Sequence, residues 1–89
     1  MYYVINTFQK SKPSFVYRED TYIDNHSLAY ILHYFEALWH TNFRDETRPY
    51  DVEDKRHRYG DAQSQIELWI WEINESEYQT YKSQGVIEI

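Results

Sequence analysis

The amino-acid sequence predicts a small α+β domain whose elements follow the order β-β-α-loop-β-α-β. Three observations support this fold class. Residues 2–8 and 65–73 are rich in β-forming side chains, and apolar residues between positions 28 and 39 recur at helical spacing. Asn74 is followed three residues later by Glu77, a pattern that predicts the start of a second helix. Together they predict one domain, residues 1–89, with a four-stranded mixed or mainly antiparallel sheet and both helices on one face.

Local signals predict the first three elements. The stretch YYVINTF, residues 2–8, forms a strand, and FVYRE, residues 15–19, returns as the second arm of a hairpin after a proline-containing turn. Asp24 is expected to cap the first helix, with Ile23 and Leu28 in the two positions of a hydrophobic staple. This helix faces the core with an apolar stripe made of Leu28, Ile31, Leu32, Phe35, Leu38 and Trp39.

Histidines recur every seventh residue along the first helix, at His26, His33 and His40, on the side opposite the apolar stripe. Seven residues span ~10.5 Å of helix, whereas a metal ion binds imidazole nitrogen at ~2.0–2.1 Å, so no two of them chelate one ion alone. We expect a solvated helix face. The alternatives are a metal shared across a dimer, a pH-sensitive surface, and a recognition surface made of His26, Tyr30, His33, Ala37 and His40.

Residues 43–64 break the apolar periodicity and predict a long charged loop. The segment holds six acidic and five basic residues with one proline and one glycine, and residues 51–59 could form two turns of charged helix. Loops of this length in small domains usually serve a function or are disordered. We therefore expect its carboxylates to contribute to partner binding: Asp45, Glu46, Asp51, Glu53 and Asp54.

The strand predicted at residues 65–73 is apolar on both faces, which is typical of a central strand. One face carries Ile66, Leu68 and Ile70, and the other carries Trp69, Trp71 and Ile73. The second helix begins at Asn74 and ends at Gly85, and VIEI closes the chain as a short strand. If the helices cover the first face, the tryptophan face is either a contact surface or is covered by the 43–64 loop.

Composition narrows the class of function. The net charge of −6 disfavours binding to a nucleic-acid backbone, and the basic cluster KRHRY, residues 55–59, stands among acids that are its expected ion-pair partners. Aromatic residues make up 19% of the chain, more than one small core is expected to hold, and aromatic side chains are enriched in protein interfaces. The chain has no cysteine, leader-like start or long apolar run, so we expect a cytoplasmic protein, in the host cytoplasm if it is viral.

No catalytic motif is present. The sequence lacks a nucleophile elbow and a glycine-rich phosphate loop, and residues 67–69 lack the lysine of an acid-x-lysine nuclease strand. The DVED stretch, residues 51–54, lacks the spacing of a calcium loop, and nothing distinguishes His57 as an acid–base catalyst. We therefore expect no enzyme activity, catalytic residue, metal or cofactor.

The sequence thus predicts a small acidic inhibitor that blocks a basic or nucleic-acid-binding surface of a target protein. Trp69 and Trp71 are the expected anchors, surrounded by the loop carboxylates, with the histidine face as a weaker candidate. In size, charge and aromatic content the chain is similar to phage anti-defence proteins (anti-CRISPR proteins among them), immunity proteins and antitoxins. One alternative is a homo-oligomeric accessory protein that pairs through its aromatic sheet face. The other is a metal-dependent nuclease or other hydrolase.

Overall fold

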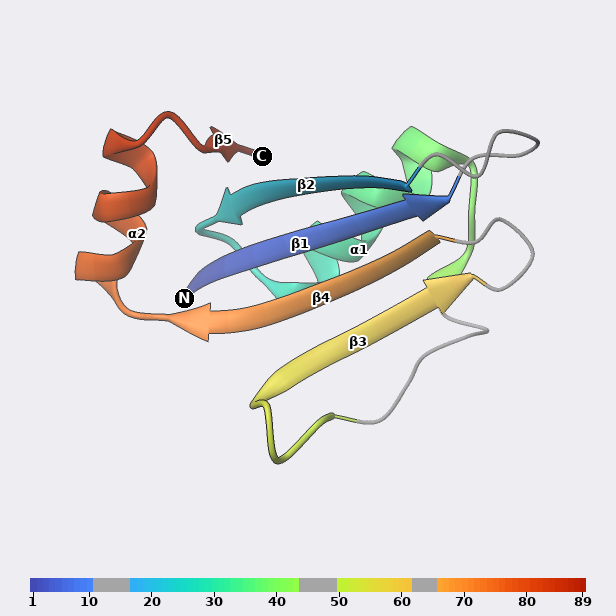
Figure 1. Ribbon diagram of the computed structural model, residues 1–89, viewed down its shortest axis with the longest axis horizontal. Coiled ribbons are helices and arrows are strands. Elements are labelled where there is room, and N and C mark those ends of the chain that lie inside the picture. Colours follow the sequence, from blue (N-terminus) through green and yellow to red (C-terminus); the bar gives the residue numbers. More distant parts are fainter. Residues whose placement is uncertain (11–16, 44–49, 62–65) are drawn as a thin grey trace.

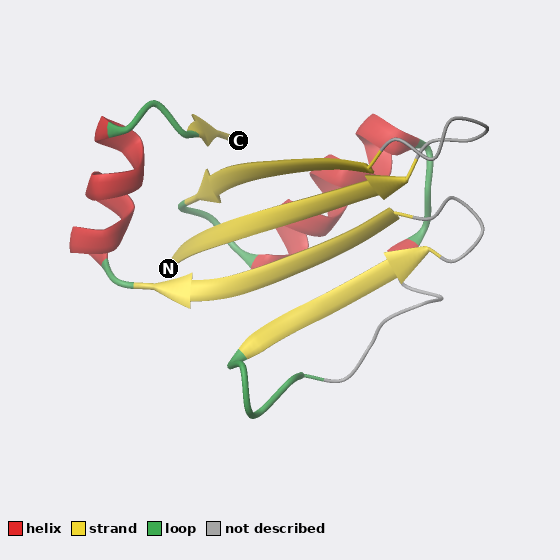
Figure 2. Cartoon of the chain, viewed as in Figure 1, coloured by secondary structure: helices red, strands yellow, loops and turns green. Residues whose placement is uncertain are grey.

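Figure 1 shows the computed structural model of the protein, which describes residues 1–10, 17–43, 50–61 and 66–89. Helices, strands and loops are distinguished in Figure 2. In chain order the elements are β1 (Tyr2–Lys10), β2 (Tyr17–Asp24), α1 (Leu28–Trp39), β3 (Arg56–Asp61), β4 (Ile66–Ile73), α2 (Glu75–Ser83) and β5 (Ile87–Glu88). In this part of the chain neither helix has the length and apolar character that crossing a membrane requires.

The strands form one sheet in the order β3-β4-β1-β2-β5, with β1 at its centre (Figure 1). β1 pairs antiparallel with β2 and β4, and β3 pairs antiparallel with β4. Only β5 runs parallel to its neighbour, next to Tyr22 and Ile23 of β2. The predicted α+β class with a mixed, mainly antiparallel sheet is confirmed, but the sheet has five strands where the sequence predicted four.

The strand that the sequence did not reveal is β3, which lies inside the predicted 43–64 loop. The expectation of a short charged helix over residues 51–59 is wrong: residues 52–55 form a turn, and residues 56–59 belong to β3. Arg56 and Arg58 face one side of the sheet, and His57 and Tyr59 face the other. Because one face carries two arginines, the segment lacks the apolar–polar alternation by which a strand is recognised in a sequence. An outer strand tolerates this composition, because charged side chains protect an exposed sheet edge from pairing with other chains.

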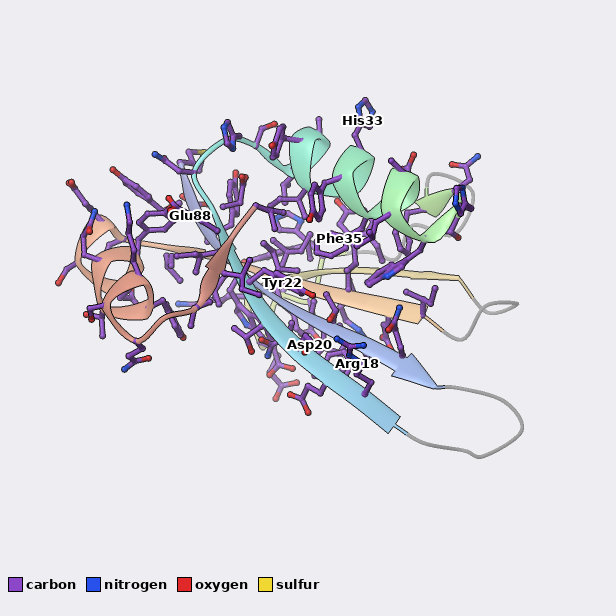
Figure 3. All side chains as sticks on the ribbon, turned by 90° about the horizontal axis from the view of Figure 1, so that it is seen from above. Arg18, Asp20, Tyr22, His33, Phe35 and Glu88 are labelled. Carbon is purple, nitrogen blue, oxygen red and sulfur yellow. The ribbon has the colours of Figure 1, made fainter. Side chains whose placement is uncertain are left out.

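α1 packs on one face of the sheet and forms the larger core there. In Figure 3, Phe35 points from α1 towards the sheet, whereas His33 points away from it. The predicted apolar stripe is confirmed, except that Leu38 is 52% exposed. The buried residues of this core are Tyr3, Ile5, Ile31, Phe35, Phe43, Leu68 and Ile70.

α2 packs against the opposite face of the sheet, at the end where β4 stops (Figure 1). Its buried Tyr78 contacts Val4 and Ile23. Because Val4 lies between Tyr3 and Ile5 in β1, its side chain points away from the α1 core. The prediction that both helices share one face is therefore wrong. α1 and Phe43 already fill that face, so α2 buries its apolar side chains on the other.

The start of α1 also differs from the prediction. Ser27, and not Asp24, is the N-cap, since its hydroxyl accepts a hydrogen bond from the backbone N–H of Tyr30 at 3.1 Å. Asp24 is the last residue of β2 and is fully buried. Its carboxylate accepts the backbone N–H of His26 at 2.9 Å and lies 2.6 Å from His26 Nδ1. Asp24 therefore fixes the turn before the helix.

The predicted ends of α2 are confirmed. The Asn74 side chain accepts the Glu77 backbone N–H at 2.8 Å, and Glu77 Oε1 accepts the Asn74 N–H at 3.2 Å, which completes a capping box. After the helix, Gly85 has a φ of 83°, a left-handed conformation that a residue without Cβ adopts at little cost.

Candidate partner-binding site

A groove of 380 Å³ lies between α2 and the face of the sheet that α1 leaves uncovered. We call it the aromatic–acidic groove. Its lining residues come from β1, β4 and α2: Val4, Asn6, Trp71, Glu72, Ile73, Glu77 and Tyr81.

The pairing of β1 with β4 positions the apolar residues of the groove. Val4 is directly opposite Trp71, so the two side chains are neighbours on the same face of the sheet. Ile73 lies two residues beyond Trp71 and therefore on the same face, and Asn6 lies two residues beyond Val4. Strand alternation thus brings four groove residues together on the side opposite the α1 core.

Tyr78 fixes α2 beside the sheet. Its ring lies 4.8 Å from the ring of Tyr2, and its hydroxyl donates a hydrogen bond to Glu88 beyond the helix. Burial, and next the hydrogen bond to Glu88, raise the pKa of Tyr78, so its hydroxyl remains a donor. The same hydrogen bond, with the charge of Lys82, lowers the pKa of Glu88. This anchoring places Glu77 and Tyr81, next to Tyr78 on α2, at the groove.

The chemistry of the groove suits a positively charged side chain with an apolar stem. The rings of Trp71 and Tyr81 offer aromatic surface, on which lysine ammonium and arginine guanidinium groups bind favourably. Glu77 adds an exposed carboxylate, which the capping box holds in place. Glu72 also lines the groove, but it is paired with Tyr3, so its side chain points to the α1 face of the sheet. The groove therefore combines aromatic surface with one exposed carboxylate, and of the residues that the sequence analysis selected it contains Trp71.

The two tryptophans predicted as anchors differ in their surroundings. Trp71 lines the groove, and its indole N–H donates to the backbone oxygen of Asp54 at 3.1 Å. Trp69 is covered instead, because the guanidinium of Arg56 lies 3.9 Å above its ring and the ring of Phe8 lies 4.3 Å away. Only Trp71 is thus placed to contact a partner in the groove.

The acidic residues predicted to bind a partner also differ in their surroundings. Asp51 and Asp54 form ion pairs with Arg56 at 3.7 and 3.0 Å, whereas Glu53 is exposed. Asp45 and Glu46 lie outside the described residues. As expected for the KRHRY cluster, its arginines pair with nearby acids.

Arg58 of the same strand bonds to Glu67 at 3.0 Å, so both arginines of β3 lie next to carboxylates and near the ring of Trp69. Their charge is balanced locally and does not form a basic patch on this face.

A second hollow of 480 Å³ adjoins the aromatic–acidic groove. Its lining shares Glu72 and Ile73 with the groove and adds Tyr50, Lys55 and Asn74. Both hollows thus include residues from the end of β4.

The weaker candidates lie elsewhere. Tyr30 and His33 are exposed on α1, on the other side of the sheet from the groove. His26 lies before the helix and His40 is its left-handed C-cap, and both are exposed as well. The rings of His26 and Tyr30 stack 4.1 Å apart. Within the described part of the chain, no group of three or more residues of metal-binding type comes together.

No protein-family model, curated protein or solved structure matches this chain, so its geometry carries the functional argument. Sequence analysis identified Trp71 but missed the other residues of the groove. Two signals pointed to them in part: the alternation of β1 places Val4 and Asn6 together, and Tyr78 and Tyr81 share one side of α2. The position of α2 relative to the sheet, which creates the groove, had no local signal.

Proposed function

We propose that this protein is a non-enzymatic inhibitor that binds a basic segment of a target protein in the aromatic–acidic groove and blocks the surface around it. The observation that carries the proposal is the juxtaposition of Trp71 and Tyr81 with the exposed carboxylate of Glu77 in one groove. We expect it to act in the cytoplasm, as anti-defence, immunity and antitoxin proteins of similar size and charge do.

The size of the groove supports a side-chain anchor. Its volume of 380 Å³ lies near the lower end of the ~300–1,000 Å³ typical of ligand sites, which is enough for one or two large side chains. An arginine can stack its planar guanidinium on an aromatic ring while its donors bind carboxylates. The groove therefore fits an arginine, or a lysine, that projects from a larger protein surface.

The charge of the whole chain supports the same partner. A net charge of −6 attracts a basic surface at long range and accelerates its association. Among the described residues, the ion pairs of Arg56 and Arg58 balance the positive charge near Trp69. An inhibitor of this kind acts by occupying the target's basic surface and excluding its natural ligand.

The proposal is tested by measuring binding to arginine-containing peptides and to matched peptides with citrulline, the uncharged analogue, in place of arginine. We expect the wild-type protein to prefer the arginine peptides and to bind them more slowly as the salt concentration rises. The variant Glu77→Gln should lose this preference while keeping the shape of the groove. Glutamine at position 77 can still accept the capping hydrogen bond of Asn74.

Glu75→Gln is the matched control, because Glu75 is an exposed carboxylate of the first turn of α2 that does not line the groove. It should leave the peptide preference unchanged. Equal binding of arginine and citrulline peptides, or an unaltered preference in Glu77→Gln, would show that the groove does not recognise a cation.

A further inference from the structure

The outward side of α1 exposes large apolar side chains that the sheet does not use. Tyr30, Tyr34 and Leu38 are 41%, 38% and 52% exposed. They stand four residues apart and so form a ridge along the helix, of the kind that packs into the grooves of another helix. Figure 3 shows this helix above the sheet, with its outer side turned away from the rest of the molecule.

This side of the molecule carries almost no charge. From residue 25 to residue 43 the sequence contains a single charged residue, Glu36, whereas the chain as a whole has a net charge of −6. A strongly basic or acidic partner gains little from such a surface. Two copies of this acidic chain repel each other least where they meet through an uncharged face.

A hollow of 570 Å³ lies beside the ridge and is lined by His33, Glu36, Ala37, Thr41 and Asn42. Ala37, the smallest of these side chains, is exposed, and the other four residues carry polar groups around it. One helix thus presents both a tyrosine-bearing ridge and a hollow that a tyrosine can enter.

We propose that α1 is a self-association surface on which two copies pair about a twofold axis, the ridge of each lying against the hollow of the other. A twofold interface requires that one surface hold both complementary parts, and α1 does. The proposal is independent of the aromatic–acidic groove, which lies on the opposite face of the sheet. The dimer would therefore leave both grooves open and present them to a partner as a pair.

The length of α1 sets the expected strength. Its twelve residues extend ~18 Å, so the contact falls short of the ~800 Å² per partner of a standard stable interface. We expect a weak dimer, with a Kd on the order of 10⁻⁴ M. Because the ridge and the hollow both lie at α1, the helix, and not the tryptophan face of the sheet, mediates this pairing.

Sedimentation equilibrium over a concentration series from about 10 µM to 1 mM tests this. We expect a reversible monomer–dimer equilibrium that Ala37→Glu weakens at least about tenfold, because the new carboxylate stands in the hollow beside Glu36. Leu38→Gln removes part of the ridge at an exposed position and should weaken it as well. Gln79→Glu adds the same charge at an exposed position of α2 and should leave the equilibrium unchanged.

Circular dichroism verifies that each variant is folded, and the two α1 variants provide separate tests if one of them is not. A wild-type protein that stays monomeric up to the highest concentration would overturn the proposal. A dimer that withstands both α1 substitutions would overturn it too, and its loss in Trp71→Ala would move the interface to the sheet.

Discussion

The two faces of the sheet are built from the same strands and differ in how completely a helix covers them. On the α1 face, Ile5, Leu68 and Ile70 are fully buried beneath the helix. On the opposite face, their neighbours Val4 and Trp71 pack against α2 but also line an open groove. Neighbouring residues of β1 or β4 therefore lie in different environments: one belongs to the closed core, and the next belongs to a candidate binding site.

The helices themselves explain this difference. α1 is twelve residues long and buries Ile31 and Phe35 against the sheet. α2 has nine residues, of which Tyr78 is the buried one, so it covers only one end of the sheet. The closed face is thus expected to determine stability, and the partly covered face is expected to determine binding.

The largest loss of stability is expected when a large side chain is removed from the core on the closed face. Phe35 is fully buried and its ring contacts those of Tyr22 and Trp39 at 5.4 and 4.8 Å. Phe35→Ala should lower the free energy of unfolding by about 3–5 kcal/mol, measured by urea denaturation, because it leaves a cavity in the core. A loss below about 1 kcal/mol would mean that α1 contributes less to stability than its burial indicates.

The next effect concerns the buried carboxylate at the entrance of α1. Asp24→Ala removes the acceptor of the His26 backbone N–H and should destabilise the protein by about 1–3 kcal/mol. Asp24→Asn keeps an acceptor oxygen at this position and should cost less. Thermal unfolding of the two variants compares them directly, and equal losses would show that the acceptor itself contributes nothing.

Tyr81 tests whether the partly covered face determines binding more than stability, because it lines the groove and is only half-buried. Tyr81→Ala should reduce the affinity for an arginine-containing peptide about tenfold, equivalent to about 1.4 kcal/mol, while changing stability less than Phe35→Ala does. Calorimetric titration measures the affinity. If stability falls as far as in Phe35→Ala, the two faces do not divide stability and binding as described.

The smallest effect is a change in pH dependence at the end of α2. The hydrogen bond from Tyr78 lowers the pKa of Glu88 in the folded protein, so the resulting stability is present when Glu88 is ionised and is lost as the pH falls through that lowered pKa. Tyr78→Phe removes the bond. Its stability should therefore decline less steeply than that of the wild type in acid, in denaturation curves recorded below about pH 5.

The sequence predicted those elements whose signals are local. The helical spacing of the apolar residues located α1, and the pair Asn74 and Glu77 located the start of α2. The alternation in residues 66–73 assigned Leu68 and Ile70 to one face and Trp69 and Trp71 to the other, as the structure has them.

The remaining features depend on contacts between distant segments. β3 was missed because Arg56 and Arg58 occupy positions where a strand normally shows apolar alternation, and ion pairs with Asp54 and Glu67 accommodate them. Asp24 and Ser27 are both residue types that cap helices, and only tertiary packing, which buries Asp24 at the end of β2, decides between them.

The aromatic–acidic groove could be predicted only in part, for the same reason. Trp71 could be selected as an aromatic anchor, but Glu77 and Tyr81 gain their roles from the side of the sheet on which α2 lies. That side was predicted wrongly, because the short connection at Asn74 carries no signal for either face.

The central place of β1 also has a consequence for the order of folding. β1 and β2 are close in sequence and can form a hairpin early, whereas β1 meets β4 only when residues as far apart as Tyr2 and Ile73 come together. Contacts between such distant residues close large loops and slow the folding of small proteins. We therefore expect the docking of β4 to limit the folding rate, with β3 and α2 becoming ordered only after that step.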